Sequence, residues 1–531
     1  MTILIYDQGC AAEKRRKRKR GIIEDPVQKI LINPEVCEGC GDCSTQSNCM
    51  SIEPLETKFG RKRKINQSTC NKDFTCIKGF CPSFISIETN DIKNIETPKL
   101  DFEIPDPEKK IDEEITNIIL TGIGGTGVLT ISAIIGMAAN IEDKKSTTLD
   151  MTGLSQKGGA VWAYIKLYDD KKKPYSHKIT PGMSDVLLAC DQVVATKDEI
   201  QEVLSKKRTY AVLNNNSAPV ADFIKNTDYD FKSEEVRDLI KNSTKEILVN
   251  IDTVGLSYKF FGNTINANMI QLGAAFQSGL IPLKKESIIE AINLNKWGAQ
   301  NNVKAFNLGR LIVHDPKHLI FEEKKHLNVD MSIAELKEIL ADYSKKSLKD
   351  FTHLESNLNK QQDLNEDLLD KILREYGRIC LIKDEYRVAS MHLKNYRKII
   401  SKDFAAWNKL SFYLAPPILS FVKDKKTNNP KKFKIPAYIA LPIFFILDKF
   451  SFIRNTPFDV FRYTKERKHD FEHKELFEQR INSLLKHANE CEILTLIESS
   501  KKVKGYGSIK EHNLNIFKKH TSKNSINAIK I

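Results

Sequence analysis

Short apolar runs alternate with helical segments in the middle of the chain. Apolar or β-branched runs predict buried strands at residues 118–120, 147–150, 161–167, 186–189 and 211–213. Helices are predicted at residues 128–139 and 268–277, the second closed by Gly279. Because strands that alternate with helices are typical of α/β proteins, we expect an α/β domain with a mainly parallel sheet over residues 113–325.

Different patterns flank this domain. Residues 330–531 are rich in Leu, Lys and Glu at helical spacing, interrupted by prolines and aromatic residues between residues 404 and 465, so we expect a mostly helical C-terminal domain. Residues 96–112 hold three prolines and many charges, which predicts a linker. Residues 2–6 form one isolated apolar run, which we interpret as the last strand of a domain whose remainder is missing.

Length and composition indicate a multi-domain protein of a reducing compartment. The chain has 531 residues, 41% of them hydrophobic, and 11 cysteines without a secretory signal. Clustered cysteines in that setting favour metal ligation over disulfides. The most apolar stretch, residues 435–447, is too short to span a bilayer and contains Pro436 and Pro442. We therefore expect a cytoplasmic location and no membrane partner.

Seven cysteines lie between residues 37 and 81, in the order C-x2-C-x2-C-x5-C followed by C-x5-C-x4-C-P. Thiolates at i, i+3 and i+6 can bind three corners of an iron–sulfur cube, and a distant Cys before Pro supplies the fourth corner. This first cysteine group therefore predicts a 4Fe–4S cluster bound by Cys37, Cys40, Cys43 and Cys81. Zinc is the alternative, since Cys37 and Cys40 alone suit a zinc knuckle. We expect a small ferredoxin-like iron–sulfur domain over residues 26–95.

The remaining three cysteines of this segment form a second group, Cys49, Cys70 and Cys76. They suggest a second 4Fe–4S cluster or a 3Fe–4S cluster that is one thiolate short. Cys10, Asp73 or solvent could complete it, and the absence of a second cluster stays open.

Charge adds a question about partners. The formal net charge is +14, and two basic runs, residues 14–20 and 61–64, bracket the first cysteines. Such runs steer an acidic redox partner, bind nucleic acid or form a solvated linker. Since no aromatic interleaving or helix-turn-helix pattern accompanies them, we expect no nucleic-acid partner.

A glycine turn offers candidate cofactor chemistry. Gly122, Gly124, Gly125 and Gly127 follow a predicted strand and precede a predicted helix, in the pattern G-x-G-x-x-G. The turn directs backbone N–H groups at an anion, and Asp150 at the end of another strand could bind a ribose. A dinucleotide site and a turn that only packs strand against helix both fit.

A second glycine segment, GLSQKGGAVW, precedes another predicted strand. Its candidate binding residues are Ser155, Gln156, Lys157, Gly158 and Gly159, because a Gly-Gly pair lets the backbone approach a ligand closely. A plain loop is the alternative. No catalytic nucleophile is evident, so the catalytic residues are unknown.

Together these segments resemble the indolepyruvate ferredoxin oxidoreductases of the 2-oxoacid:ferredoxin oxidoreductase family, most closely the long bacterial form. The run VCEGCGDCSTQSNC through GFCPSF is similar to its ferredoxin-type segment, and GIGGTGVLT with GLSQKGGAVWAYIKL resembles its gamma domain. NTPFDVFRYTKER and KVKGYGSIKEHNL resemble its C-terminal extension, and DQGCAAEKRRKRKRG resembles the junction after its thiamine-diphosphate domain.

The resemblance implies oxidative decarboxylation of an aryl 2-oxoacid such as indolepyruvate, with coenzyme A as co-substrate and ferredoxin as electron acceptor. It implies that thiamine diphosphate and Mg²⁺ bind to a separate half, since no G-D-G…N signature occurs in this sequence. Residues 1–25 would be a remnant strand and basic linker after that half. The alternative is an NAD- or FAD-linked iron–sulfur electron-transfer subunit that uses the glycine turn.

Overall fold

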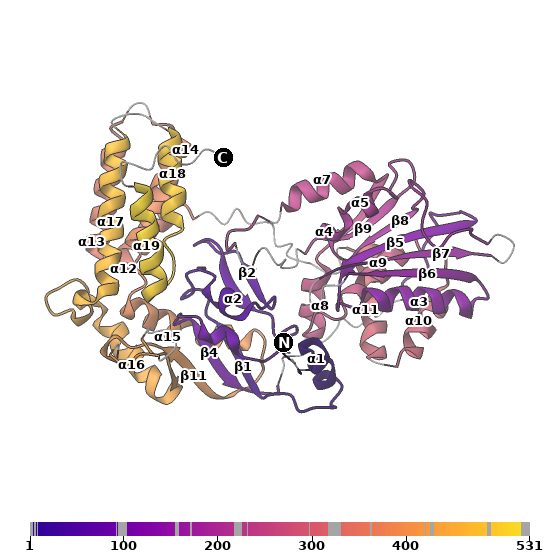
Figure 1. The fold of residues 1–531 in the computed structure, drawn as a ribbon, viewed down its shortest axis with the longest axis horizontal. Coiled ribbons are helices and arrows are strands. Elements are labelled where there is room, and N and C mark those ends of the chain that lie inside the picture. Colours follow the sequence, from indigo (N-terminus) through magenta and orange to yellow (C-terminus); the bar gives the residue numbers. More distant parts are fainter. Residues whose placement is uncertain are drawn as a thin grey trace.

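The computed structural model describes residues 4, 7, 9–91, 93, 103–153, 159–169, 173–216, 223, 226–230, 232–296, 298–316, 331–361, 364–419, 421–424, 430–485 and 490–521. An N-terminal cysteine domain lies between an α/β domain and a helical C-terminal region (Figure 1). Among the described residues, no helix combines the length and the apolar character needed to cross a membrane.

The α/β domain is built on a six-stranded sheet of order β10-β9-β8-β5-β7-β6. Its strands are β5 (Ile115–Ile123), β6 (Lys145–Thr152), β7 (Ala160–Tyr168), β8 (Val186–Ala189), β9 (Tyr210–Asn214) and β10 (Glu246–Ile251). The pairs from β10 to β5 are parallel, whereas β7 is antiparallel to both β5 and β6. The sheet is therefore mixed, and the expectation of a mainly parallel sheet holds for one side of β5.

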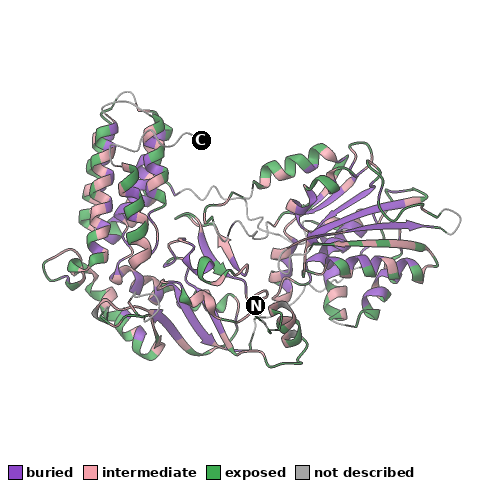
Figure 2. Ribbon diagram, viewed as in Figure 1, coloured by how far each residue is buried: buried purple, intermediate pink, exposed green. Residues whose placement is uncertain are grey.

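Helices cover both faces of this sheet. They are α3 (Val128–Ile141), α4 (Gln192–Ala195), α5 (Asp198–Gln201), α7 (Ser233–Ser243), α8 (Thr253–Phe261), α9 (Ala267–Gln277), α10 (Lys285–Leu294) and α11 (Ala299–His314). Ile118 and Leu120 of β5 pack with α3, α9, α10 and α11, while Ile119 packs with α4, α5 and α7 on the opposite face. Because successive side chains of a strand point to opposite faces, an uninterrupted apolar run packs into the hydrophobic cores on both faces of the sheet, and the strands are buried (Figure 2).

The cysteine domain is small and poor in regular structure. It comprises α1 (Ala11–Lys19), β1 (Gln28–Ile32), α2 (Asp42–Ser47), β2 (Ile52–Leu55), β3 (Lys62–Ile65), η1 (Thr75–Lys78) and β4 (Phe84–Glu88). Strands β2 and β3 form an antiparallel hairpin, and β1 pairs antiparallel with β4. Cys43 lies in α2 and Cys76 in η1, and the other cysteines of this domain lie outside its helices and strands.

The C-terminal region is mostly helical, as its pattern predicts. Its elements are α12 (Ile333–Tyr343), α13 (Lys345–Leu358), α14 (Glu366–Cys380), α15 (Glu385–Ser401), β11 (Asn408–Leu414), η2 (Pro417–Leu419), β12 (Phe433–Pro436), α16 (Ala437–Lys449), η3 (Phe450–Ile453), η4 (Val460–Tyr463), α17 (Lys465–Leu484), α18 (Glu490–Lys501) and α19 (Gly507–Thr521). Helices α12, α13, α14, α17, α18 and α19 share one hydrophobic core. Their inner faces are buried and their outer faces exposed (Figure 2).

A second sheet joins the C-terminal region to the cysteine domain. Its order is β1-β4-β11-β12, and β11 pairs antiparallel with β4, Phe412 opposite Ile85. One face carries Ile30, Ile32 and Phe84 towards the cysteines. The other face carries Leu31, Ile85 and Ile87 towards α15 and α16. The sequence pattern did not anticipate this shared sheet, which places Tyr413 and Lys432 beside the candidate cluster ligands.

The connecting segments differ in part from expectation. Residues 103–112 of the predicted linker have neither helix nor strand, but Ile104 and Ile111 are buried in the core of the α/β domain. Arg310 of α11 donates to the carbonyls of Ile104 and Pro105, at 2.9 and 3.2 Å. The end of the linker is thus docked on the α/β domain. The predicted strand at residues 2–6 lies outside the described residues, apart from Leu4.

Candidate functional site

The structure gathers the first cysteine group from two segments. Cys37 and Cys40 lie between β1 and α2, Cys43 lies in the first turn of α2, and Cys81 lies three residues before the start of β4. Burial raises the pKa of Cys43, and the nearby thiols of Cys37 and Cys81 raise it further. Burial likewise raises the pKa of Cys81 to about 11, with Cys37 adding to the effect. The four thiols predicted to share one site therefore lie close enough to affect one another's ionisation.

Backbone geometry explains how the two segments meet. Gly39 and Gly41 have φ of +73° and +80°, and a Cβ on Gly39 would lie 2.2 Å from the Arg61 carbonyl oxygen. Only glycine tolerates this conformation and this approach. The Asp42 carboxylate accepts a hydrogen bond from the Phe80 N–H at 2.6 Å, which fixes the α2 segment to the Cys81 segment.

The second cysteine group is also brought together. Burial raises the pKa of Cys76 to about 12, and the thiols of Cys70 and Cys49 contribute next. Asp73 is close enough to raise the pKa of both Cys70 and Cys76. Cys10 is exposed at the start of α1. Cys10 acts on Arg15 together with Cys70 and Cys49, so both Asp73 and Cys10 lie near this group and its fourth ligand stays a prediction.

Buried polar atoms without partners surround both groups. Among the described residues the unpartnered donors include Ser44 Oγ and Arg63 Nε beside the first group, and Arg18 Nε beside the second. Arg63 is 1% exposed, and its guanidinium is close enough to Cys43, Cys37 and Cys40 for their charges to raise its pKa against the lowering effect of burial. Unsatisfied buried donors are costly, so charged acceptors are the expected complement.

The donor set fits iron–sulfur clusters. Thiols crowded together in a buried site ionise only with a compensating cation, and bound metal deprotonates them outright. Across the described parts of the chain, no three His, Cys, Asp or Glu side chains converge closely enough to hold a single metal ion. The 4Fe–4S and 3Fe–4S clusters therefore stay predictions from the donor set.

Three basic side chains lie beside the cysteines. Besides Arg63, Arg15 of α1 has Cys70 and Cys49 as neighbours, and Lys432, which precedes β12, has Cys81, Cys76 and Cys43. Burial lowers the pKa of Lys432 to about 8, against the raising effect of the thiols. Sequence reasoning missed Lys432, because only the pairing of β11 with β4 brings it to the site.

Part of each basic run is built into the cysteine domain, while Lys14, Arg16, Lys17, Arg20 and Lys64 are exposed. The first run forms α1, whose Arg15 and Arg18 donate to the carbonyls of Thr69 and Asn71 at 2.8 and 2.6 Å. In the second run, Lys62 and Arg63 are buried in β3, and burial lowers the pKa of Lys62 to about 7. Burial leaves these two charges unsuited to long-range steering.

The glycine turn connects β5 to α3, as predicted. Gly125 and Gly127 have φ of +86° and +99°, and Gly127 precedes the first residue of α3. A Cβ on Gly122 would lie 2.5 Å from Val128 Cγ2, so this glycine allows the strand and helix to pack closely. The Gly124 N–H donates to the Gly159 carbonyl at 2.8 Å.

The two predicted glycine segments therefore meet at Gly124 and Gly159. Ser155, Gln156, Lys157 and Gly158 lie outside the described residues, and their role as a binding loop stays a prediction.

The structure does not support Asp150 as the ribose ligand of a dinucleotide site. In a nucleotide-binding α/β unit, the strand carrying the ribose ligand is parallel and adjacent to the first strand. Here Asp150 lies on β6, an edge strand antiparallel to β7 and separated from β5 by it. Its carboxylate accepts a hydrogen bond from Ser132 of α3 at 3.0 Å. Asp150 therefore does not occupy the ribose-binding position.

Comparison with known families agrees with this architecture. Residues 117–312, the α/β domain, match the family "Pyruvate ferredoxin/flavodoxin oxidoreductase". Residues 338–523 match a "Family of unknown function (DUF6537)". The chain thus combines a 2-oxoacid oxidoreductase domain with a C-terminal region whose role is undefined.

Individual relatives indicate which kind of oxidoreductase subunit the α/β domain is similar to. The indolepyruvate oxidoreductase subunit IorB of Pyrococcus horikoshii is 29% identical over 195 residues, which are 36% of this chain and 93% of the relative. The IorB subunit of Thermococcus kodakarensis is 27% identical over 195 residues, with the same coverage. The α/β domain belongs to the pyruvate ferredoxin/flavodoxin oxidoreductase family and is homologous to IorB.

Solved structures match a similar share of the chain. A keto/oxoacid ferredoxin oxidoreductase gamma subunit from Geobacter sulfurreducens covers 37% of this chain and 98% of its own, at 20% identity and a TM-score of 0.27. A 2-oxoglutarate:ferredoxin oxidoreductase from Magnetococcus marinus covers 38% of this chain and 31% of its own, at 17% identity and a TM-score of 0.29.

Proposed function

We propose that this chain is the electron-transfer and gamma-domain portion of an indolepyruvate-type 2-oxoacid:ferredoxin oxidoreductase. The observation that carries the proposal is the joining, in one chain, of an IorB-like α/β domain with two grouped sets of cysteines. The first group holds a 4Fe–4S cluster through Cys37, Cys40, Cys43 and Cys81. The second holds a cluster through Cys49, Cys70 and Cys76, with Asp73 as its fourth ligand.

The proposed reaction is the oxidative decarboxylation of an aryl 2-oxoacid. The bond to the carboxylate breaks and releases CO2, and a thioester bond forms to coenzyme A. The two electrons set free reduce two ferredoxins, and the thiol proton is released. Bound iron–sulfur clusters supply one-electron redox chemistry, which separates a two-electron oxidation into single transfers. The fold holds the cysteine thiolates in position and shields them from water. Arg63, Arg15 and Lys432 lie beside them.

The reaction needs a partner that binds thiamine diphosphate and Mg²⁺. An apolar surface of the C-terminal region supports this requirement. Its exposed side chains lie on α16 and the turns around it: Tyr438, Ile439, Ile443, Phe445, Ile446, Phe450, Phe452, Phe458, Val460 and Tyr463. Phe452 and Phe458 are exposed to 75% and 81%, and exposed aromatic side chains of this kind are enriched at protein interfaces. We assign this surface to the thiamine-diphosphate half.

The test is turnover with and without that half. Indolepyruvate, coenzyme A, thiamine diphosphate and Mg²⁺ are supplied under anaerobic conditions, and reduction of ferredoxin or a viologen dye is followed. We expect no turnover by the chain alone and coenzyme A-dependent reduction with both halves. Pyruvate and 2-oxoglutarate serve as competing substrates. Robust turnover by the isolated chain, or faster turnover of pyruvate, would contradict the proposal.

A further inference from the structure

The C-terminal region touches the backbone around the first cysteine group from several directions. The Tyr506 hydroxyl donates to the Val36 carbonyl at 2.6 Å, and Lys383 Nζ donates to the Cys37 carbonyl at 2.9 Å. A ring nitrogen of His392 lies 2.9 Å from the Pro82 carbonyl. Residues far away in the sequence thus hold the segments that carry Cys37 and Cys81.

Two glycines let the C-terminal chain come closer still. A Cβ on Gly505 would lie 3.4 Å from the Cys40 Cβ, and one on Gly507 would lie 2.3 Å from the Phe80 ring. Both glycines have positive φ, +110° and +53°. The segment that leads into α19 therefore packs directly on the cysteine loops.

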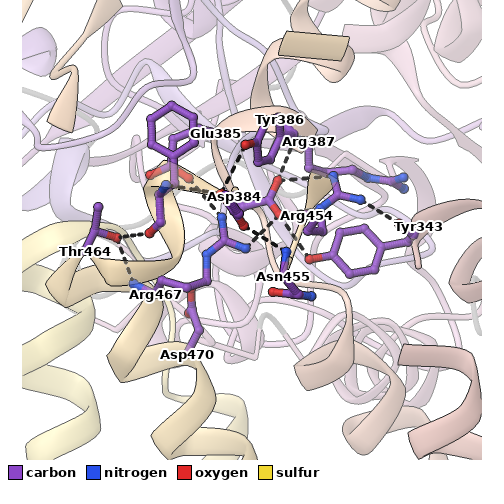
Figure 3. A network of polar contacts seen from close by, with 12 residues as sticks. Tyr343, Asp384, Glu385, Tyr386, Arg387, Arg454, Asn455, Thr464, Arg467 and Asp470 are labelled. Carbon is purple, nitrogen blue, oxygen red and sulfur yellow. Dashed lines mark hydrogen bonds and ion pairs between the residues drawn. The ribbon is translucent and has the colours of Figure 1, made fainter. Parts of the chain in front are cut away.

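A buried polar network fixes the turn from which Lys383 projects. The buried Asp384 carboxylate is paired with Arg454 at 2.6 Å and Arg467 at 2.9 Å (Figure 3). Asp384 also caps α15 through the Arg387 N–H at 2.7 Å. Because both carboxylate oxygens are engaged, the backbone beside Lys383 is held in one place. Lys383 in turn pairs with Glu38 at 2.9 Å, next to Cys37.

Lys432 is the charged member of this contact surface. Its Nζ donates to the Gly79 carbonyl, and it lies 4.6 Å from the centre of the Phe84 ring on the cysteine face of the sheet. Its neighbours include Cys81 and Cys43 of the first group and Cys76 of the second. One ammonium group therefore lies near both sets of thiols.

We propose that the C-terminal region is the outer shell of the cluster site, and that Lys432 raises the reduction potential of the clusters bound there. This rests on the proposed function. Reduction adds negative charge to a cluster, and a nearby cation favours the reduced form, more strongly where water is excluded. Lys432 therefore places a positive charge beside the clusters. It belongs to a C-terminal region that matches a family of unknown function.

The test is a potentiometric titration of the full chain, purified without oxygen and followed by electron paramagnetic resonance. Lys432→Met removes the charge and keeps the apolar stem. The controls are Lys431→Met and Lys434→Met, which remove the same charge from exposed neighbours. We expect Lys432→Met to lower the potential of the first cluster by about 59 mV, a tenfold change in its one-electron equilibrium constant. Lys432→Arg and both controls should leave it close to wild type.

Measuring the iron content distinguishes a failure of the Lys432 proposal from a failure of the proposed function. Iron and acid-labile sulfide in the wild type test whether clusters exist, whereas the potential tests Lys432. An unchanged potential in Lys432→Met at full iron content would overturn the inference. If Lys432→Met loses its iron, Lys432→Gln, which keeps a donor for Gly79, is titrated instead. Loss of iron there too, or an equal shift in the two controls, would also overturn it.

Discussion

The two cysteine groups differ in the number of their thiols and in what braces them. The first has four thiols, and its flanking backbone is held by Lys383, His392 and Tyr506 of the C-terminal region. The second has three thiols and is held by Arg15 and Arg18 of α1. A site braced by a large packed region opens rarely, while one braced by a short, half-exposed helix opens more often. We therefore expect the first cluster to be the more durable.

Substitution of a single cysteine in one group is expected to give the largest difference between the two clusters. Cys81→Ser should remove the first cluster, a loss of about four iron atoms per chain. Cys76→Ser should remove only the second and leave the signal of the first unchanged. Iron analysis and low-temperature paramagnetic resonance of both variants check this. The grouping would be wrong if either substitution removed both signals in a protein with native circular dichroism.

The brace from the C-terminal region can be weakened without touching a ligand. Lys383→Met removes the ion-pair partner of the largely buried Glu38. Burial raises the pKa of Glu38, and the charges of Lys383, then Lys62 and Lys510, bring it well below its usual range. Breaking such a pair costs about 3 kcal/mol. The first cluster should then be lost faster to a chelator, with the second unaffected. Lys394→Met, an exposed charge on α15, is the control, and equal rates of loss in both variants would contradict the assigned brace.

The fourth ligand of the second group gives a smaller, local effect. Asp73→Ala should lower the iron content by about one atom per chain, because three thiols suffice for a three-iron cluster. The first cluster should keep its spectrum. Asp91→Ala, at an exposed carboxylate, is the matched control. An unchanged second cluster in Asp73→Ala would show that another group completes it.

The helical bundle behind the first group should respond to pH. Burial keeps the pKa of His473 well below its usual value, and the charges of Arg378 and Lys510 lower it further. The unfolded chain therefore binds a proton that the folded chain does not. The contribution of His473 to stability is complete above about pH 6.5 and falls below it, by at most about 1.4 kcal/mol per pH unit. His473→Gln should flatten this slope in urea unfolding at pH 5 to 7, and an unaltered slope would count against it.

Much of the α/β domain could be predicted from the sequence. The strand at residues 186–189 appears as β8 with the same bounds, and the helix at residues 268–277 appears as α9 from Ala267. Buried strands and small-residue helices carry their own pattern. The antiparallel placement of β6 and β7 could not be predicted, because pairing direction depends on contacts between strands and not on local composition.

The candidate site also has features that could be predicted from the sequence and features that could not. The spacing of the cysteines predicts which thiols lie near one another, while the clusters that they bind stay a prediction. The surrounding charges could not be found: Lys432 lies 351 residues from Cys81 in sequence, and nothing in its local pattern differs from Lys431 or Lys434. Its position depends on β11 and β12 extending a sheet that begins at residue 28.

The central claim is that this chain carries electrons through iron–sulfur clusters bound by the two cysteine groups. The most direct measurement is the iron, acid-labile sulfide and zinc content of the anaerobically purified chain, with its paramagnetic spectrum after reduction. The account predicts a brown protein with about seven or eight iron atoms and a similar amount of sulfide per chain. Zinc without iron or sulfide, with a normally folded protein, would contradict it.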